Sequence, residues 1–136
     1  MTLADVPSAA WDAIAARGFD LLFLMGVWRR SPVGQDIARR HEGLRGEYDR
    51  TLPGWTDADV VGSPYCISAY EPDDRMGGWP GLAHARRQLR TRGIALIVDF
   101  VPNHTAFDHA WVAAHPEWYV LGTEQDAQAA PTHSTS

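Results

Sequence analysis

The stretch that decides the fold reads Ile94-Ala95-Leu96-Ile97-Val98-Asp99-Phe100-Val101-Pro102-Asn103-His104-Thr105. It begins with an unbroken apolar run rich in β-branched side chains, which is typical of a strand buried on both faces. Such strands occur in parallel sheets covered by helices. Asp99 ends the apolar run, and Asn103 and His104 follow after a proline turn. The pattern predicts a strand over 94–100 with polar side chains at its carboxyl end, where α/β folds bind ligands.

The preceding chain predicts a second buried strand and two helices. Phe19–Met25 is another apolar run, bounded by Gly18 and Gly26. Periodic apolar residues predict one helix over 7–17 and another over 80–92. Helix, strand, helix, strand is the order of parallel βαβ units. We therefore expect an α/β fold in which the two strands lie side by side and parallel.

Residues 26–79 are expected to form a long, irregular excursion between these units. Ser31 and Pro32 favour a short helix that extends to His41, with Ser31 as its cap. Glycines and prolines then punctuate the passage from 43 to 54. A single helical turn is expected near 57–61, where the spacing fits a capping box. An insertion of this length is typical of a functional loop assembly.

The sequence after His104 is aromatic and acidic. A short helix is predicted over 108–114, capped by Asp108 and ending before Pro116. From Gly122 to Ser136 the sequence has no periodicity, so we expect a disordered tail there. The predicted folded part is accordingly a single unit over residues 1–121.

Composition limits the function classes. The chain has 136 residues, a formal net charge of −5 and an apolar fraction of 45%. This mild acidity argues against nucleic acid as a partner, because such binding depends on basic groups that neutralise phosphates. No membrane helix is expected, because no apolar run approaches 18 residues. The single cysteine, Cys66, and an N-terminus without a basic region predict a cytoplasmic protein.

Four arginines are clustered within a short segment: Arg86, Arg87, Arg90 and Arg92. We interpret them as a solvated helix face whose charges complement the negative end of the helix dipole. An anion or phosphate site is the alternative.

The segment from Asp99 to His104 resembles the first signature segment of the α-amylase superfamily, glycoside hydrolase family 13, whose pattern is Asp-x-x-x-Asn-His. Residues 16–28 are similar to the family's second barrel strand with its preceding helix. Residues 62–78 resemble the substrate-side segment that leads towards strand three, and residues 82–104 resemble the next helix and strand three. The resemblance spans about residues 5–121. It implies a partial (β/α)8 TIM barrel: two parallel strands with covering helices and a long inserted loop.

The resemblance also implies roles for four residues. Asp99 would lie beside the catalytic centre and hold polar groups without reacting itself. His104 would hydrogen-bond a hydroxyl of the sugar in the cleaved position, and Tyr65 would stack on that sugar. Asn103 is, in many members, a calcium ligand or a brace for the loop after strand three, so calcium is a candidate cofactor. The implied partner is an α-linked glucose oligosaccharide or disaccharide.

Each role has a structural alternative. Asp99 could cap backbone amides at the end of the strand, and His104 could be a core histidine. Cys66 is expected to be a small buried hydrophobe.

The catalytic carboxylates of the family have no counterpart in this sequence. Its members hydrolyse or transfer α-glucosidic bonds with retention, using a carboxylate nucleophile and a second carboxylic acid that come from later strands. A closed barrel takes about 250 residues. We therefore expect an inactive fragment of a glycosidase or transglycosidase. Its exposed sheet edges would favour self-association.

Two alternatives remain open. The chain could be a noncatalytic sugar-binding or assembly module that uses Tyr65, His104 and nearby tryptophans as a platform. It could also be a metal-dependent hydrolase whose ligands come from a histidine-rich segment, since imidazole and carboxylate groups bind zinc. The residues of that third hypothesis are His104, Asp108, His109 and His115.

Overall fold

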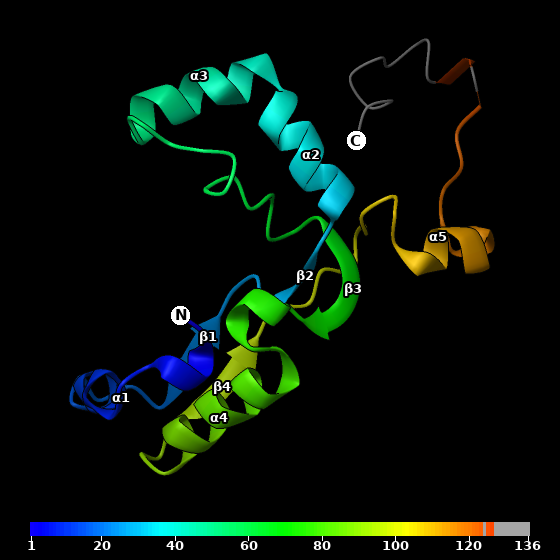
Figure 1. The fold of residues 1–136 in the computed structure, drawn as a ribbon. Helices are drawn as coiled ribbons and strands as arrows, with labels where there is room; N and C mark the ends of the chain where they lie inside the picture. The colour runs from blue at the N-terminus through cyan, green and yellow to red at the C-terminus, as the bar shows by residue number, and fades with distance from the viewer. Residues whose placement is uncertain (124, 127–136) are drawn as a thin grey trace.

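The computed structural model, which describes residues 1–123, 125 and 126, has a mixed α/β fold (Figure 1). Strands β1 (Leu21–Leu24) and β4 (Ala95–Val98) pair in parallel, with Leu21 opposite Ala95 and Leu24 opposite Val98. The predicted parallel pairing of the two apolar runs is therefore confirmed. The parallel sheet has two strands and does not close a barrel within the described residues.

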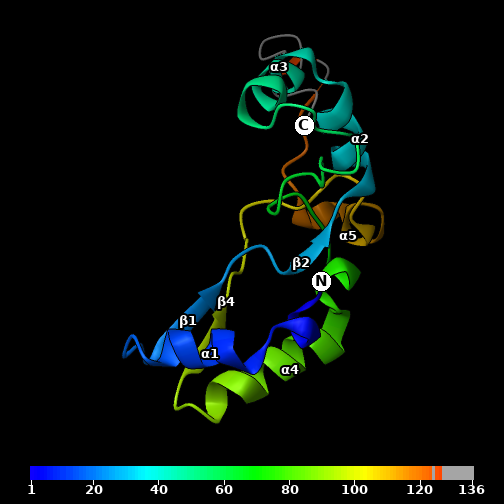
Figure 2. The same cartoon turned by 60° about the vertical axis from the view of Figure 1, so that its left-hand side comes forward.

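The two predicted helices form, and they cover one face of this pair. They are α1 (Ser8–Ala15) and α4 (Gly78–Arg90). Trp11, Leu89 and Ile94 form the buried centre of the core, and Leu22 and Leu96 pack against it from the sheet. Figure 2 shows α1 and α4 on the same side of β1 and β4. The apolar stripes of the two helices thus form the main core together with one face of the sheet.

The prediction that both strands are buried on both faces is wrong. Burial alternates along β1 and β4, and the outward side chains of Leu21, Phe23 and Ile97 are 58%, 51% and 43% exposed. The reason is geometric: side chains alternate along a strand, and the helices among the described residues cover only one face. The strand is also shorter than 94–100, since the Ile94 N–H bonds to the Leu89 carbonyl at the end of α4.

The excursion is more ordered than expected. It contains a second, antiparallel sheet made of β2 (Trp28–Arg30) and β3 (Ile67–Pro72). The Arg29–Glu71 ion pair (2.7 Å) and the edge-to-face packing of Trp28 on Tyr70 (centroids 5.5 Å apart) join these strands.

The excursion also contains two helices, which extend away from the parallel pair (Figure 2). They are α2 (Pro32–Arg40) and α3 (Glu42–Thr51). The predicted cap of α2 is confirmed, because Ser31 Oγ accepts the Gly34 N–H at 2.8 Å. The sequence did not predict α3, whose glycines disfavour a helix. In place of the expected helical turn near 57–61, the chain forms a turn closed by hydrogen bonds. The Asp59 carboxylate accepts hydrogen bonds from the backbone N–H and the hydroxyl of Thr56.

After β4 the chain forms a short helix, α5 (Ala110–Ala114), and a 3₁₀ turn over Pro116–Trp118. Two further 3₁₀ turns span Leu3–Asp5 and Asp74–Met76. The cap of α5 is His109 rather than the predicted Asp108: His109 Nδ1 accepts the Trp111 N–H at 3.1 Å.

Of the predicted disordered tail over 122–136, residues 124 and 127–136 lie outside the described residues. Among the helices that are described, none combines the length and apolar character needed to cross a membrane.

Candidate functional site

Asp99 and Gly26 meet at the carboxyl ends of β4 and β1. Asp99 Oδ1 accepts the Gly26 N–H at 3.1 Å. Gly26 has a φ of +65°, and a Cβ at this position would lie 2.4 Å from Pro64 Cβ, so the turn requires glycine. The alternative that Asp99 caps a backbone amide is therefore confirmed. Its other oxygen is buried without a hydrogen-bond partner among the described residues.

The second sheet holds the segment that leaves β4. The Trp28 indole N–H donates to the Asp99 carbonyl at 2.7 Å, and the Tyr70 hydroxyl donates to the Val101 carbonyl at 2.5 Å. Burial, with the nearby negative charge of Asp99, raises the pKa of the Tyr70 phenol, so this hydroxyl stays protonated and can donate. The unpredicted β2–β3 sheet therefore positions the loop that carries Asn103 and His104.

Tyr65 and His104 line one cavity of about 340 Å³, which we call the Tyr65–His104 cavity. Tyr65 is 39% exposed, and His104 is exposed too. The alternative of a core histidine at position 104 is therefore wrong. The remaining lining residues come mainly from α2 and from the loop after His104: Gly34, Ile37, Ala38, Leu44, Ser63, Cys66, Thr105, Ala106 and Phe107. Asp99 does not line this cavity.

A second cavity, of about 450 Å³, adjoins the first at the same loop, because His104 and Thr105 line both. We call it the aromatic cavity. Five rings line it: Tyr70, Phe100, Trp111, Trp118 and Tyr119. Asn103 also lines it, together with Val101, Pro102 and Val120.

The loop that lines both cavities is held by hydrogen bonds to β3 and to Tyr119. The Ala106 N–H donates to the Ile67 carbonyl of β3 at 2.9 Å, and the hydroxyls of Thr105 and Tyr119 lie 2.9 Å apart. His109 is only 5% exposed, and this burial lowers the pKa of its imidazole. The neutral ring keeps Nδ1 free to accept the hydrogen bond that caps α5.

Cys66 is half-buried, in contrast to the buried hydrophobe that the sequence predicts. Burial raises the pKa of its thiol, against the opposing effect of a hydrogen bond with Ser31. Ser31 is 2% exposed, and its hydroxyl donates to Asp108 Oδ2 at 2.9 Å. These contacts join the start of α2 to the loop before α5.

Metal ligands do not converge in the part of the chain that the structure describes, where no group of three or more His, Cys, Asp or Glu side chains could hold an ion. Asn103 is exposed, and its amide nitrogen lies 3.4 Å from His104 Nδ1. A calcium ion at Asn103 would thus lack a set of carboxylate ligands from the described residues. The histidines and Asp108 do not assemble the metal site of the third hypothesis either.

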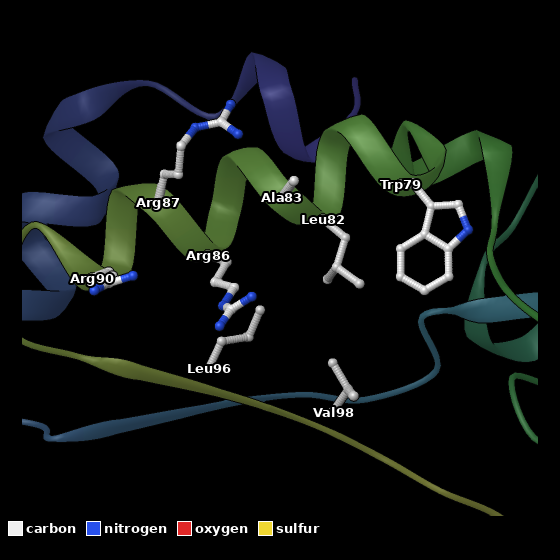
Figure 3. Close-up of a pocket in the computed structure, with 8 residues that line it drawn as sticks. All are labelled: Trp79, Leu82, Ala83, Arg86, Arg87, Arg90, Leu96 and Val98. Carbon is white, nitrogen blue, oxygen red and sulfur yellow. The ribbon is translucent and has the colours of Figure 1, made fainter.

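The four arginines occupy two environments. Arg92, whose side chain is 15% exposed, forms an ion pair with Asp12 at 2.7 Å. The prediction of a solvated face is therefore wrong for Arg92. The other three line a groove of about 440 Å³ between α4 and β4, with Trp79, Leu82, Ala83, Leu96 and Val98. Figure 3 shows Leu82 and Val98 pointing towards each other and Arg87 directed away from the strand. This groove shares no lining residue with the two cavities described above.

No protein-family model and no curated protein matches this chain. The similarity to α-amylases consequently remains a resemblance of the segments that carry it.

The structure brings together two of the predicted site residues, Tyr65 and His104, and places Asn103 beside the second cavity. The sequence did not assign Tyr70 or Tyr119 to the site. The sequence suggested the tryptophans after His104 only as part of a general sugar-binding platform. The density of aromatic residues over 107–119 was the available signal, but their spacing does not reveal that the rings share one cavity.

Proposed function

We propose that this chain contributes part of the sugar-binding end of an α-amylase-type (β/α)8 barrel, acting on α-linked glucose oligosaccharides or disaccharides. The observation that carries the proposal is the convergence of Tyr65 and His104, from separate segments, on one cavity beside the loop that follows β4. Ligand sites in α/β barrels lie at this end of the strands.

The chemistry of the cavity suits a sugar ring. A half-exposed tyrosine presents an apolar face to the C–H groups of a pyranose, while an imidazole exchanges hydrogen bonds with its hydroxyls. The volume of about 340 Å³ falls within the range of roughly 300–1,000 Å³ typical of small-molecule sites. In this proposal Asp99 does not bind the sugar. It supports the site indirectly, because its carboxylate fixes the turn at Gly26.

The uncovered face of the parallel sheet supports the proposal that the chain belongs to a barrel. Leu21, Phe23 and Ile97 form an exposed apolar surface at adjacent positions of β1 and β4. The interior of a (β/α)8 barrel is filled with layers of branched apolar side chains. Further strands that pair with the outer edges of β1 and β4 would bury this surface and would carry the reacting carboxylates.

The proposal predicts sugar binding without hydrolysis by the chain alone. A retaining glycosidase needs two carboxyl groups about 5–5.5 Å apart across the scissile bond, whereas no Asp or Glu of the described residues lines either cavity. We expect purified chain to bind maltose with a Kd in the millimolar range, about −4 kcal/mol, in a saturation-transfer NMR titration. Incubation with maltooligosaccharides should release no glucose, and hydrolysis with retained configuration would contradict the account.

Two substitutions test whether maltose binds in the Tyr65–His104 cavity. Tyr65→Ala and His104→Ala should each weaken maltose binding by roughly three- to tenfold, because each removes one contact of the ring. His84→Ala, on α4 and outside both cavities, is the matched control and should leave binding unchanged. Equal affinities for the wild type and both site variants would refute the proposal.

The absence of carboxylates among the described lining residues also favours a second candidate, a noncatalytic sugar-binding module. The two candidates differ in affinity. A self-sufficient module should bind maltose in the micromolar range, about −8 kcal/mol, whereas part of a pocket should bind about a thousandfold more weakly.

A further inference from the structure

The groove between α4 and β4 is the feature that the proposed function leaves unused. It shares no lining residue with the Tyr65–His104 cavity or the aromatic cavity, so its role is independent of sugar binding. We propose that this groove binds a free amphiphilic anion with a single hydrocarbon chain. The anionic head lies between Arg86 and Arg90, and the chain lies over Leu82 and Val98.

The α4 helix carries two stripes of side chains. One stripe, which includes Ala85 and Leu89, is buried in the main core. A second stripe runs beside it at helical spacing and lines the groove: Trp79, Leu82, Ala83, Arg86 and Arg90. Figure 3 shows Trp79 and Arg90 at opposite ends of this row. The second stripe is therefore apolar in the first half of α4 and cationic in the second half.

The apolar end of the groove keeps surface for a ligand. Leu82 of α4 and Val98 of β4 point towards each other there, and Arg86 lies beside Leu96 (Figure 3). Leu82, Leu96 and Val98 are each partly exposed, and Trp79 is 60% exposed. A hydrocarbon chain placed along these side chains would remove apolar surface from water on both sides of the contact.

The cationic end offers charge without a partner of opposite sign. A second hollow, of about 410 Å³, extends the groove past Arg86 and Arg90 to Gly93. Neither arginine forms an ion pair with another described residue, and no Asp or Glu of the described residues lines the groove or its extension. The backbone N–H groups of Gly93 and Ile94 already donate to carbonyls of α4. The two guanidinium groups are thus the donors for an anionic head, which they can bind through paired hydrogen bonds.

The separation of the two ends selects a ligand with a head and a tail. The helical rise places Leu82 and Arg90 about 12 Å apart along the axis of α4, a distance that an extended chain of about ten carbons spans. A partner helix would instead present charged side chains along the whole length of its polar face. The groove has its charges at one end only, which favours the amphiphile.

The proposal predicts that binding requires both the anionic head and the chain. Decanoate, below its micelle concentration, is titrated into the full chain, and the methyl resonances of Leu82 and Val98 are followed by NMR. We expect decanoate to bind roughly tenfold more tightly than decyltrimethylammonium, which has the same chain and a cationic head. It should bind about fourfold more tightly than octanoate, because two further methylene groups are partly buried. Equal affinities for the anion and the cation, or decanoate shifts that leave Leu82 and Val98 unchanged, would overturn the inference.

A double substitution tests the head site. Arg86→Gln with Arg90→Gln should weaken decanoate binding about fivefold and leave that of decyltrimethylammonium unchanged or stronger. Arg17→Gln with Arg50→Gln is the matched control. It removes the same charge from two exposed arginines, and Arg50 also lies in the last turn of its helix. Equal effects of the two double variants would show that net charge alone acts, and would overturn the head site.

The tail site is tested at Trp79. Trp79→Ala should reduce the gain in affinity from octanoate to decanoate, because the indole lies at the end that the chain reaches. Trp118→Ala is the matched control, since Trp118 is 59% exposed but lines the aromatic cavity. A gain that persists unchanged in folded Trp79→Ala, with unaltered circular dichroism, would contradict the direction assigned to the chain.

Other occupants of the groove give different results. If the double change at Arg86 and Arg90 lowers the apparent mass of the ligand-free chain in light scattering, a second copy fills the groove. If vesicles of anionic phospholipid bind the chain through the same arginines, the groove faces a membrane. If an acidic amphipathic helical peptide binds there more tightly than decanoate, the occupant is a partner helix. Each of these results would overturn the proposed free amphiphile.

Discussion

Two histidines of one loop, His104 and His109, have opposite environments. His104 is exposed between the two cavities, whereas His109 is 5% exposed and packs against Trp111 with centroids 4.5 Å apart. The first can exchange hydrogen bonds with a ligand. The second is a structural group that caps α5 through Nδ1. The role of a core histidine, which the sequence offered as an alternative for His104, belongs to His109.

The burial of His109 predicts a pH-dependent stability. Because burial lowers its pKa in the folded protein, the unfolded chain binds the proton more readily, and stability is lost as pH falls below about 6.5, the ordinary histidine value. His109→Asn keeps a side chain that can cap α5 but cannot become charged. We expect urea titrations to show a smaller loss of unfolding free energy between pH 7 and pH 5 in this variant. An identical loss in both proteins would exclude His109 as the source.

At the scale of elements, Ser31 joins the start of α2 to the loop before α5. Its oxygen accepts the Gly34 N–H and its hydroxyl donates to Asp108, whose other oxygen is buried without a partner among the described residues. Removing the hydroxyl would therefore both uncap a helix and leave a carboxylate without its hydrogen bond.

Ser31→Ala should accordingly lower the free energy of unfolding by about 2–3 kcal/mol, which combines a lost cap with an unsatisfied buried acceptor. Thr56→Ala provides the matched control. The Thr56 hydroxyl also makes a local hydrogen bond, to the Asp59 carboxylate, but Thr56 is exposed. We expect this change to cost less than about 1 kcal/mol. Chemical denaturation measures both, and equal losses would contradict the link between α2 and the loop.

The elements that the sequence predicted are those with a strong local pattern. The apolar runs around Phe23 and Ile97 specified the parallel strands, and the stripe containing Leu89 specified α4. The β2–β3 sheet lacks such a pattern, because its first strand has three residues, two of which are arginines. That sheet depends on tertiary contacts such as Trp28 with Tyr70. The site was accessible only through the resemblance, since no local rule places Tyr65 beside His104.

At the scale of the whole molecule, the helices among the described residues cover one face of the parallel sheet and leave the other face open (Figure 2). Phe23 and Ile97 lie opposite each other in the parallel register and are both about half exposed on the open face. Contiguous apolar surface of this kind marks an interaction site or a tendency to aggregate.

We therefore predict that the isolated chain self-associates through this face. The apparent mass in light scattering should rise with concentration, and the double variant Phe23→Lys with Ile97→Lys should shift the protein towards the monomer. Leu52→Lys is the matched control, because Leu52 is 52% exposed against 51% for Phe23 but lies at the end of α3. Self-association that persists in the double variant would exclude this face.

The location of maltose on the protein tests the central claim most directly. In an NMR titration of the full chain, the ring resonances of Tyr65 and His104 should shift with increasing maltose, while those of His41, at the start of α3, should not. Shifts confined to the groove around Trp79, or no shift of either Tyr65 or His104, would contradict a sugar pocket at the loop after β4.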